Sequence, residues 1–66
     1  MDKDIPSIIR EARIAAGLTQ EQVAEALGYK SRQAPQRWEL GARPVPDEKK
    51  RALANLLGIT VDDLVP

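Results

Sequence analysis

Four side chains that can form paired, coplanar hydrogen bonds lie between residues 32 and 37 of this 66-residue chain. Gln33 and Gln36 carry amides that donate and accept side by side, and Arg32 and Arg37 carry planar guanidinium groups. Such groups can bond two neighbouring atoms of a base edge, as an amide does at adenine N6 and N7 and a guanidinium at guanine O6 and N7. The cluster predicts a surface for base contacts, and the alternative is a polar outer face without a ligand.

The segment that carries this cluster follows a short amphipathic helix and a glycine. Thr19 with Gln22 is typical of a capping box at a helix start, and Gly28 is typical of a helix end. Between them, the apolar side chains that repeat at helical spacing are Val23, Ala24 and Leu27. We therefore expect a helix, a tight turn and a second helix between Thr19 and Gly41.

Pro35 constrains the start of this next helix, because a proline past the first turn deletes a hydrogen bond and clashes with the preceding turn. We expect the regular helix to start at residues 32–34 and residues 29–32 to form an extended or irregular turn. The i, i+3, i+4 rule then places Ala34, Pro35 and Trp38 on one side. It leaves the outer side to Gln33, Gln36 and Arg37.

The rest of the chain also reads as helical. Residues 7–16 predict a first helix that Gly17 ends, and Asp47 is placed to cap a fourth helix that Gly58 ends. Residues 40–46 form a loop with one glycine and two prolines, and residues 60–63 form a last short turn whose Leu64 can reach the core. No segment alternates with period two. The expected fold is all-α, with four helices and a C-terminal turn in a single domain over residues 1–66.

Composition disfavours several classes of function. The chain has no cysteine and no histidine, which argues against disulfides, thiolate or imidazole metal sites and most nucleophilic catalysis. It has no glycine-rich phosphate loop and no apolar run of membrane-spanning length. We expect a cytoplasmic protein that is not an enzyme, uses no cofactor and no metal, and binds no small molecule or membrane.

Charge is balanced over the chain but unevenly distributed. Ten basic and ten acidic side chains give a net charge of zero, which alone disfavours a nucleic-acid partner. Residues 28–51, however, hold seven basic and three acidic side chains, an excess of four positive charges. This asymmetry suits one basic face, although a solvated surface would look the same.

These features together resemble the XRE family, the Cro and CI type helix-turn-helix regulators of phage and bacteria. The resemblance runs from Ile8 to Leu64, and the positions that carry it are Arg10, Arg13, Gly17-Leu18-Thr19-Gln20, Val23-Ala24, Leu27-Gly28, Arg37-Trp38-Glu39, Gly41, Arg43-Pro44, Leu53-Ala54 and Leu57-Gly58. It implies a compact lambda-repressor-like fold of four to five helices, with the helix-turn-helix at about residues 19–41. The implied partner is double-stranded DNA, entered at the major groove by the third helix.

The resemblance also implies roles for single residues. Base contacts fall to Gln33 and Arg37, with Arg32 and Gln36 where such regulators contact bases or phosphates. Phosphate contacts fall to four residues, Gln20, Lys30, Ser31 and Arg43. Arg13 and Glu39 match an ion pair that joins the first helix to the end of the third, and the alternative is an Arg13 that faces phosphate.

Three positions depart from the family pattern. The turn holds one residue more than usual, Pro35 stands where the family has Ile or Val, and Lys50 stands at a position that is usually apolar. The first two shift the register of Arg32 and Gln33 and favour phosphate over base contact for Arg32. The third predicts a fourth helix that docks less firmly or directs its lysine elsewhere.

We expect a homodimer, at least on DNA, because useful affinity for an operator usually needs two half-sites about 34 Å apart. The interface is predicted at Ile59, Val61, Leu64 and Val65, unless these side chains only close the monomer's own core. The expected function is that of a repressor acting by occlusion on a pseudo-palindromic operator. The alternative is an antitoxin-like or adaptor module that uses the same fold to bind protein. We treat the chain as complete, or else as the DNA-binding part of a longer regulator.

Overall fold

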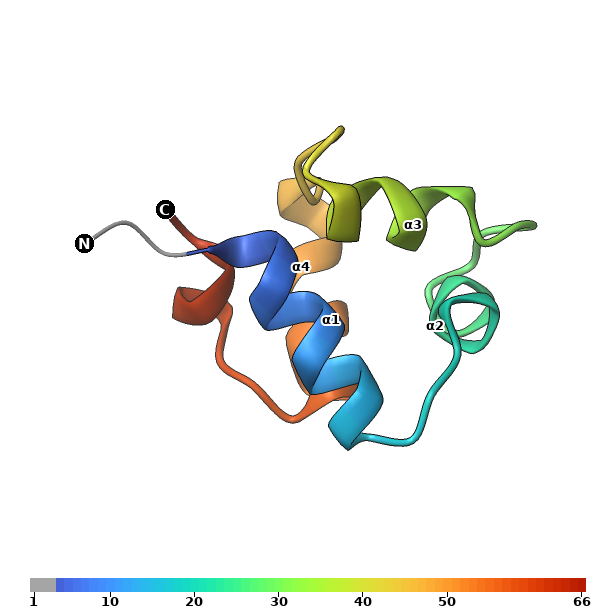
Figure 1. The fold of residues 1–66 in the computed structure, drawn as a ribbon, viewed down its shortest axis with the longest axis horizontal. Helices are drawn as coiled ribbons and strands as arrows, with labels where there is room; N and C mark the ends of the chain where they lie inside the picture. Colours follow the sequence, from blue (N-terminus) through green and yellow to red (C-terminus); the bar gives the residue numbers. More distant parts are fainter. Residues whose placement is uncertain (1–3) are drawn as a thin grey trace.

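The computed structural model describes residues 4–66, which form four α-helices and a C-terminal 3-10 turn (Figure 1). The elements are α1 (Ile5–Ala15), α2 (Gln20–Ala26), α3 (Gln33–Leu40), α4 (Asp47–Leu57) and the 3-10 turn η1 (Val61–Leu64). The described residues contain no strand. The all-α prediction is therefore confirmed.

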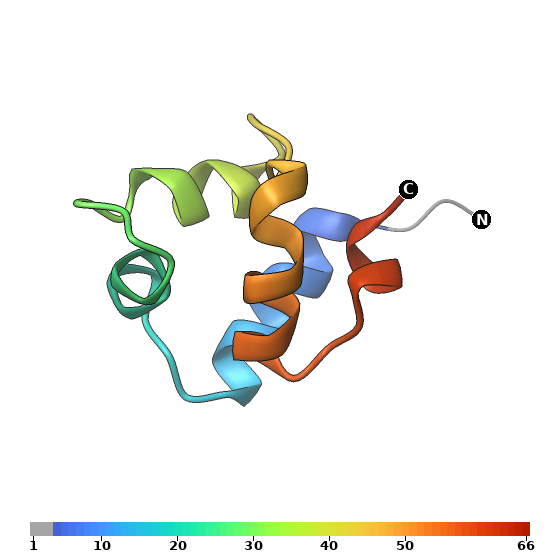
Figure 2. The ribbon, with the colours of Figure 1, turned by 180° about the vertical axis from the view of Figure 1, so that it is seen from behind.

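The helices surround one apolar core. α1 and α4 lie on opposite faces of the molecule, and α3 lies across one end of both (Figures 1 and 2). α2 is seen end-on in the view in which α3 is seen from the side, so the two helices of the motif cross at a large angle. Every element contributes to the core, whose buried residues are Ile9, Val23, Leu27, Trp38, Val45, Leu53, Ala54, Leu57 and Leu64.

The start of α1 differs from the expectation of residue 7. Asp4 caps the helix: its carboxylate accepts hydrogen bonds from the Ser7 backbone N–H at 3.3 Å and from Ser7 Oγ at 2.8 Å. Pro6 lies in the first turn, where its missing N–H breaks no helical bond. The cap thus moves the helix start to Ile5.

The ends of α2 follow the predicted pattern. Thr19 Oγ1 accepts from the Gln22 N–H at 3.0 Å, and Gln22 Oε1 accepts from the Thr19 N–H at 2.8 Å, which completes the capping box. Gly28 adopts a φ of 86°, in the left-handed region that favours glycine. The chain can therefore turn sharply after α2 and lead into α3.

Pro35 is the third residue of α3, as its chemistry required. The helix begins at Gln33, and its first backbone hydrogen bond runs from the Gln36 N–H to the Arg32 carbonyl at 3.1 Å. The N–H groups of the first three helical residues have no helical acceptor in any sequence. Proline at this place therefore removes no bond, and the predicted start between residues 32 and 34 is confirmed.

Asp47 does not cap α4 as predicted. It is the first helical residue, Pro46 is at the cap position, and no side chain caps this end. The Asp47 carboxylate accepts from Lys50 Nζ at 2.8 Å. Because Pro46 already fixes the extended backbone before the helix, the acidic side chain is left for this surface ion pair.

The C-terminal turn buries one of the residues predicted to form the dimer interface. Thr60 and Asp63 form a second capping box that holds η1, and this places Leu64 in the core with 2% of its surface exposed. Leu64 therefore cannot contribute to a dimer interface in this fold. Ile59 is partly buried against the same core, whereas Val61 and Val65 are 38% and 39% exposed.

Replacing Thr19 with Ala removes the hydroxyl of the α2 capping box and should lower the free energy of unfolding by about 1 kcal/mol. Thr19→Ser keeps the acceptor and should stay close to the parent protein. Urea unfolding followed by Trp38 fluorescence measures both. Equal losses in the two variants would show that the methyl group, rather than the cap, matters at this position.

Candidate nucleic-acid interface

The outer face of α3 is formed by Gln33, Gln36 and Arg37, whose side chains are all exposed. On the inner face, Pro35 is buried and Trp38 is only 3% exposed. The side chain of Trp38 is large enough to anchor the helix on the core. The helix therefore presents the two amides and the guanidinium together, without using them for packing.

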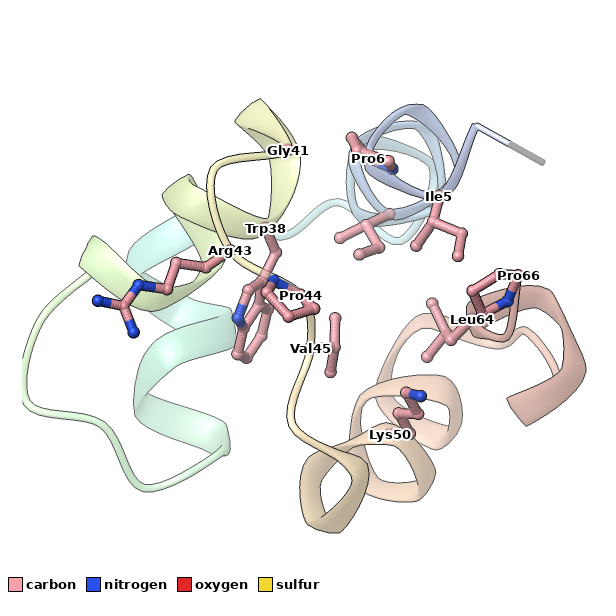
Figure 3. Close-up of a pocket in the computed structure, with 11 residues that line it drawn as sticks. Ile5, Pro6, Trp38, Gly41, Arg43, Pro44, Val45, Lys50, Leu64 and Pro66 are labelled. Carbon is pink, nitrogen blue, oxygen red and sulfur yellow. The ribbon is translucent and has the colours of Figure 1, made fainter. Parts of the chain in front are cut away.

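A hollow of about 380 Å³ lies between α3 and the loop that follows it. Arg37 borders it from the helix and Arg43 from the loop, and Tyr29 and Trp38 contribute aromatic surface. A second pocket, which is apolar, lies on the other side of this loop, and Figure 3 shows the Arg43 side chain directed away from it. Lys30, Ser31 and Gln33 line an adjoining hollow together with Tyr29 and Arg37. Five of the predicted contact residues thus border one continuous region beside α3.

Gln20 and Arg32 line a separate polar hollow, which also includes Arg10 and Thr19. Arg32 is the N-cap of α3 and is exposed, so it belongs to the turn rather than to the outer helix face. The predicted contact residues therefore fall into two groups. Some form the outer face of α3, and the others, which include the cations Lys30, Arg32 and Arg43, lie beside that face. Gln36 borders none of these hollows and lies on the exposed face alone.

The cations around α3 are not neutralised within the described chain. Among residues 4–66, no ion pair involves Lys30, Arg32, Arg37 or Arg43. Arg13, Lys49 and Lys50, by contrast, each bond to a group of the protein itself. The positive charge that could meet an anionic partner is therefore concentrated around α3 and its flanking turns, although the chain as a whole has no net charge.

Arg13 and Glu39 form the ion pair that the family resemblance implies, so Arg13 does not take the alternative place facing phosphate. Arg13 Nε donates to Glu39 Oε2 at 2.7 Å, and Arg13 Nη2 donates to Oε1 at 3.1 Å. The two side chains are 15% and 5% exposed. The hydrogen bond from Arg13 to Glu39 raises the pKa of the guanidinium despite its partial burial, so the guanidinium stays charged. A two-point contact of this kind fixes orientation as well as distance.

Glu39 also holds Gln20, which the sequence did not indicate. Gln20 Nε2 donates to Glu39 Oε1 at 3.2 Å, while Arg13 Nη1 donates to the Leu18 carbonyl at 2.9 Å. One carboxylate thus connects α1, α2 and α3. One N–H of the Gln20 amide is used here, and the second N–H is available to another acceptor.

Lys50 supplies an ion pair at the position that departs from the family pattern. Its side chain is 19% exposed and bonds to Asp47, which is 95% exposed. The hydrogen bond from Lys50, and then its charge, lower the pKa of the Asp47 carboxyl. Lys50 borders an apolar pocket of about 310 Å³ formed by α1, the loop after α3 and the C-terminus (Figure 3). The lysine therefore emerges beside the core, and α4 remains packed through Leu53, Ala54 and Leu57.

The described residues provide neither a metal site nor a membrane-spanning helix. Across the described residues, no group of three acidic side chains is placed to hold a metal ion. Likewise, none of the helices between residues 4 and 66 is long and apolar enough to cross a membrane.

The chain matches a known family over most of its length. A family model described as helix-turn-helix matches residues 9–64, which is most of the chain. No curated protein matches the chain significantly. The matched range begins within α1 and includes α2, α3, α4 and the whole surface around α3.

Removal of either partner of the Arg13–Glu39 pair should be costly, because the other charge is left partly buried. We expect Arg13→Met and Glu39→Met each to lower the free energy of unfolding by about 2–4 kcal/mol, and the double variant to lose less than the sum. Urea unfolding of the full double-mutant cycle measures the coupling.

The matched control is the pair of Lys50 and Asp47, because Asp47 is almost fully exposed. Lys50→Met and Asp47→Asn should show a coupling clearly smaller than that of Arg13 and Glu39. Strict additivity in the Arg13 and Glu39 cycle would mean that their contact does not fix α3.

Proposed function

Because the chain belongs to the XRE-type family of helix-turn-helix domains, which are DNA-binding regulators, we propose that it is a sequence-specific transcriptional repressor. In this proposal α3 enters the major groove of a pseudo-palindromic operator. The single observation that carries the proposal is the outer face of α3, where two amides and a guanidinium are exposed together on a helix anchored by Trp38.

Base recognition falls to that face. A glutamine amide matches adenine N6 and N7, and an arginine guanidinium matches guanine O6 and N7. We assign base contacts to Gln33, Gln36 and Arg37. Arg32 is the N-cap residue of α3 and lies in the turn rather than on the outer face of the helix. This position favours a phosphate contact for Arg32, although a guanidinium could also contact a base.

Phosphate contacts on the two sides of α3 would fix the domain on the duplex. Gln20 and Arg32 lie on one side, and Lys30, Ser31 and Arg43 lie around the hollows on the other. Three of these residues are cations that flank α3: Lys30, Arg32 and Arg43. None of them forms an ion pair within residues 4–66, so their positive charge is available to phosphate. Neutralised phosphates release counterions, so binding should weaken steeply with salt.

A homodimer on DNA remains part of the proposal, with a smaller interface than the sequence suggested. Val61 and Val65 are the exposed apolar residues of the C-terminal segment, and Ile59 is partly buried beside them. A two-fold dimer would place two copies of α3 about one helical turn apart. A dimer bound at a promoter would act by occlusion, at the nucleoid of the cytoplasm.

A protein-interaction module is the second candidate, and one observation favours it. The chain has zero net charge, and a partner protein does not require a basic surface. Leu40 at the end of α3 is 72% exposed, but a single exposed aliphatic side chain is normal on a protein surface and marks no contact by itself. Arg32, Arg37 and Arg43, which form no ion pair within residues 4–66, favour DNA.

Selection from a pool of random-sequence duplexes, at about 50 and 200 mM salt, tests the proposed function. We expect enrichment of a two-fold symmetric site and an affinity that falls steeply between the two salt concentrations. Absence of both enrichment and salt-sensitive binding would reject DNA recognition and favour the interaction module.

Arg37→Ala and Arg43→Ala should have different effects on the selected duplex. Loss of Arg37 should relax the preference at one base pair by about 1–3 kcal/mol, whereas loss of Arg43 should weaken all duplexes alike and reduce the salt slope by about one. Titrations of selected and random duplexes over a salt series separate the two effects.

Arg51→Ala is the control for these variants, because Arg51 is exposed on α4 and lines none of the hollows beside α3. It should leave both the preference and the salt slope unchanged. If Arg37→Ala and Arg43→Ala both lose affinity with an unaltered preference, the base-contact assignment is wrong.

Val65→Asp tests the dimer, because a charge placed at an apolar contact between two copies would oppose association. We expect sedimentation on a two-half-site duplex to show two copies of the parent protein and one copy of the variant. Val65→Thr, which nearly keeps the shape, should retain two copies. Two copies bound in every case would place the interface elsewhere.

A further inference from the structure

The turn between α2 and α3 has few backbone bonds of its own. Tyr29 donates to the Ala24 carbonyl at 2.9 Å, and the next backbone bond along the chain is donated by Gln36 to Arg32 at 3.1 Å. The N–H groups of Lys30, Ser31 and Arg32 donate no backbone hydrogen bond within residues 4–66. Gln33 N–H has only a 3.5 Å contact to Ser31 Oγ. Something other than the main chain must therefore set the start of α3.

Lys49 of α4 makes two contacts with this turn. Its Nζ donates to the Leu27 carbonyl at 2.8 Å and lies 5.2 Å from the centroid of the Tyr29 ring. The Leu27 carbonyl is at the C-terminal end of α2, where helical carbonyls lack partners and a cation is favourable. Contact with the ring adds a cation–π interaction. One side chain thus holds both the end of α2 and the first residue of the turn.

Tyr29 transmits this contact to α3. Its ring meets the Trp38 ring edge-on, with centroids 5.7 Å apart and planes at 74°. Trp38 is 3% exposed and cannot move without disturbing the core. Edge-to-face aromatic pairs have a preferred geometry, so the position of Tyr29 and the position of α3 depend on each other.

We propose that Lys49 is a positioning residue that fixes the turn before α3 and thereby the register of Gln33 and Arg37 toward the bases. The proposal rests on the proposed DNA-binding function. In it, the ammonium group acts inside the protein, on Leu27 and Tyr29, and contacts no phosphate. α4 thereby becomes part of the recognition apparatus through one side chain.

Lys49→Met tests this role, and Lys50→Met is the matched control, because the adjacent lysine on the same helix bonds only to the exposed Asp47. For Lys49→Met we expect the ratio of selected-duplex to random-duplex affinity to fall about tenfold, the size of one weakened base contact. The salt slope should stay that of the parent protein. Lys50→Met should change neither quantity. Lys49→Arg, which keeps a donor and a cation over the ring, should recover most of the preference.

A direct phosphate contact would give a different result. Lys49→Met would then weaken selected and random duplexes equally and reduce the salt slope by about one. That result, or an unchanged preference in Lys49→Met, would overturn the proposal.

Amide hydrogen exchange in the free protein tests the same contact without DNA. Lys49→Met should raise exchange of the Gly28, Tyr29 and Gln36 amides, whose backbone hydrogen bonds border the turn, relative to the amides of α1, and Lys50→Met should not. If the parent protein fails to bind any duplex, a rise localised to the Gly28, Tyr29 and Gln36 amides would still support the positioning role while the proposed function fails. A uniform rise over the whole chain, with Lys49→Arg behaving likewise, would make Lys49 a general stabilising residue and would reject the proposal.

Discussion

The arrangement of the helices depends most on the Glu39 carboxylate, which is 5% exposed and accepts hydrogen bonds from both Arg13 and Gln20. A carboxylate buried in this way is costly unless its partners are in place. The carboxylate is therefore fully bonded only when α1, α2 and α3 are all in place. The chief effect of the pair is the orientation of α3, because burial of two charges offsets much of their attraction.

At its other end, α3 is held by aromatic contacts. Glu39 lies near the last residues of the helix, whereas Tyr29 and Lys49 fix the turn that precedes it. Between these two points Trp38 fills the core. Every inward group of α3 is thus committed to packing or bonding, and its outward amides and Arg37 are not. A chain without net charge can present a cationic surface here because residues 28–51 hold seven basic and only three acidic side chains. Two of those acids, Glu39 and Asp47, are paired with Arg13 and Lys50.

Local chemistry was predictable from the sequence, and contacts between distant residues were much less so. The capping box of Thr19, the turn at Gly28 and the delayed start of α3 at Pro35 each follow from one residue and its neighbours. The prediction that Asp47 caps α4 is wrong, because Pro46 occupies the cap position and Asp47 is the first helical residue. An aspartate at a cap and a proline just before a helix are both typical of a helix start, and the sequence does not show which residue is the cap. Leu64 is as apolar as Val61 and Val65, so the sequence does not distinguish them, and only the fold shows that Leu64 is buried. Gln20 contacts Glu39 across a separation of 19 positions, and Lys49 contacts Leu27 across 22 positions. No local pattern encodes contacts of this kind, and the Arg13–Glu39 pair was predictable only through the family resemblance.

The central claim is that α3 contacts bases from the major groove, and chemical interference at those bases tests it most directly. Dimethyl sulfate methylates guanine at N7 in the major groove and adenine at N3 in the minor groove. On the selected duplex, methylation of guanine N7 within each half-site should abolish binding of the parent protein, because N7 is an acceptor for Arg37. The same treatment should matter less to Arg37→Ala at one guanine. Interference confined to adenine N3, or none at any guanine, would contradict the account.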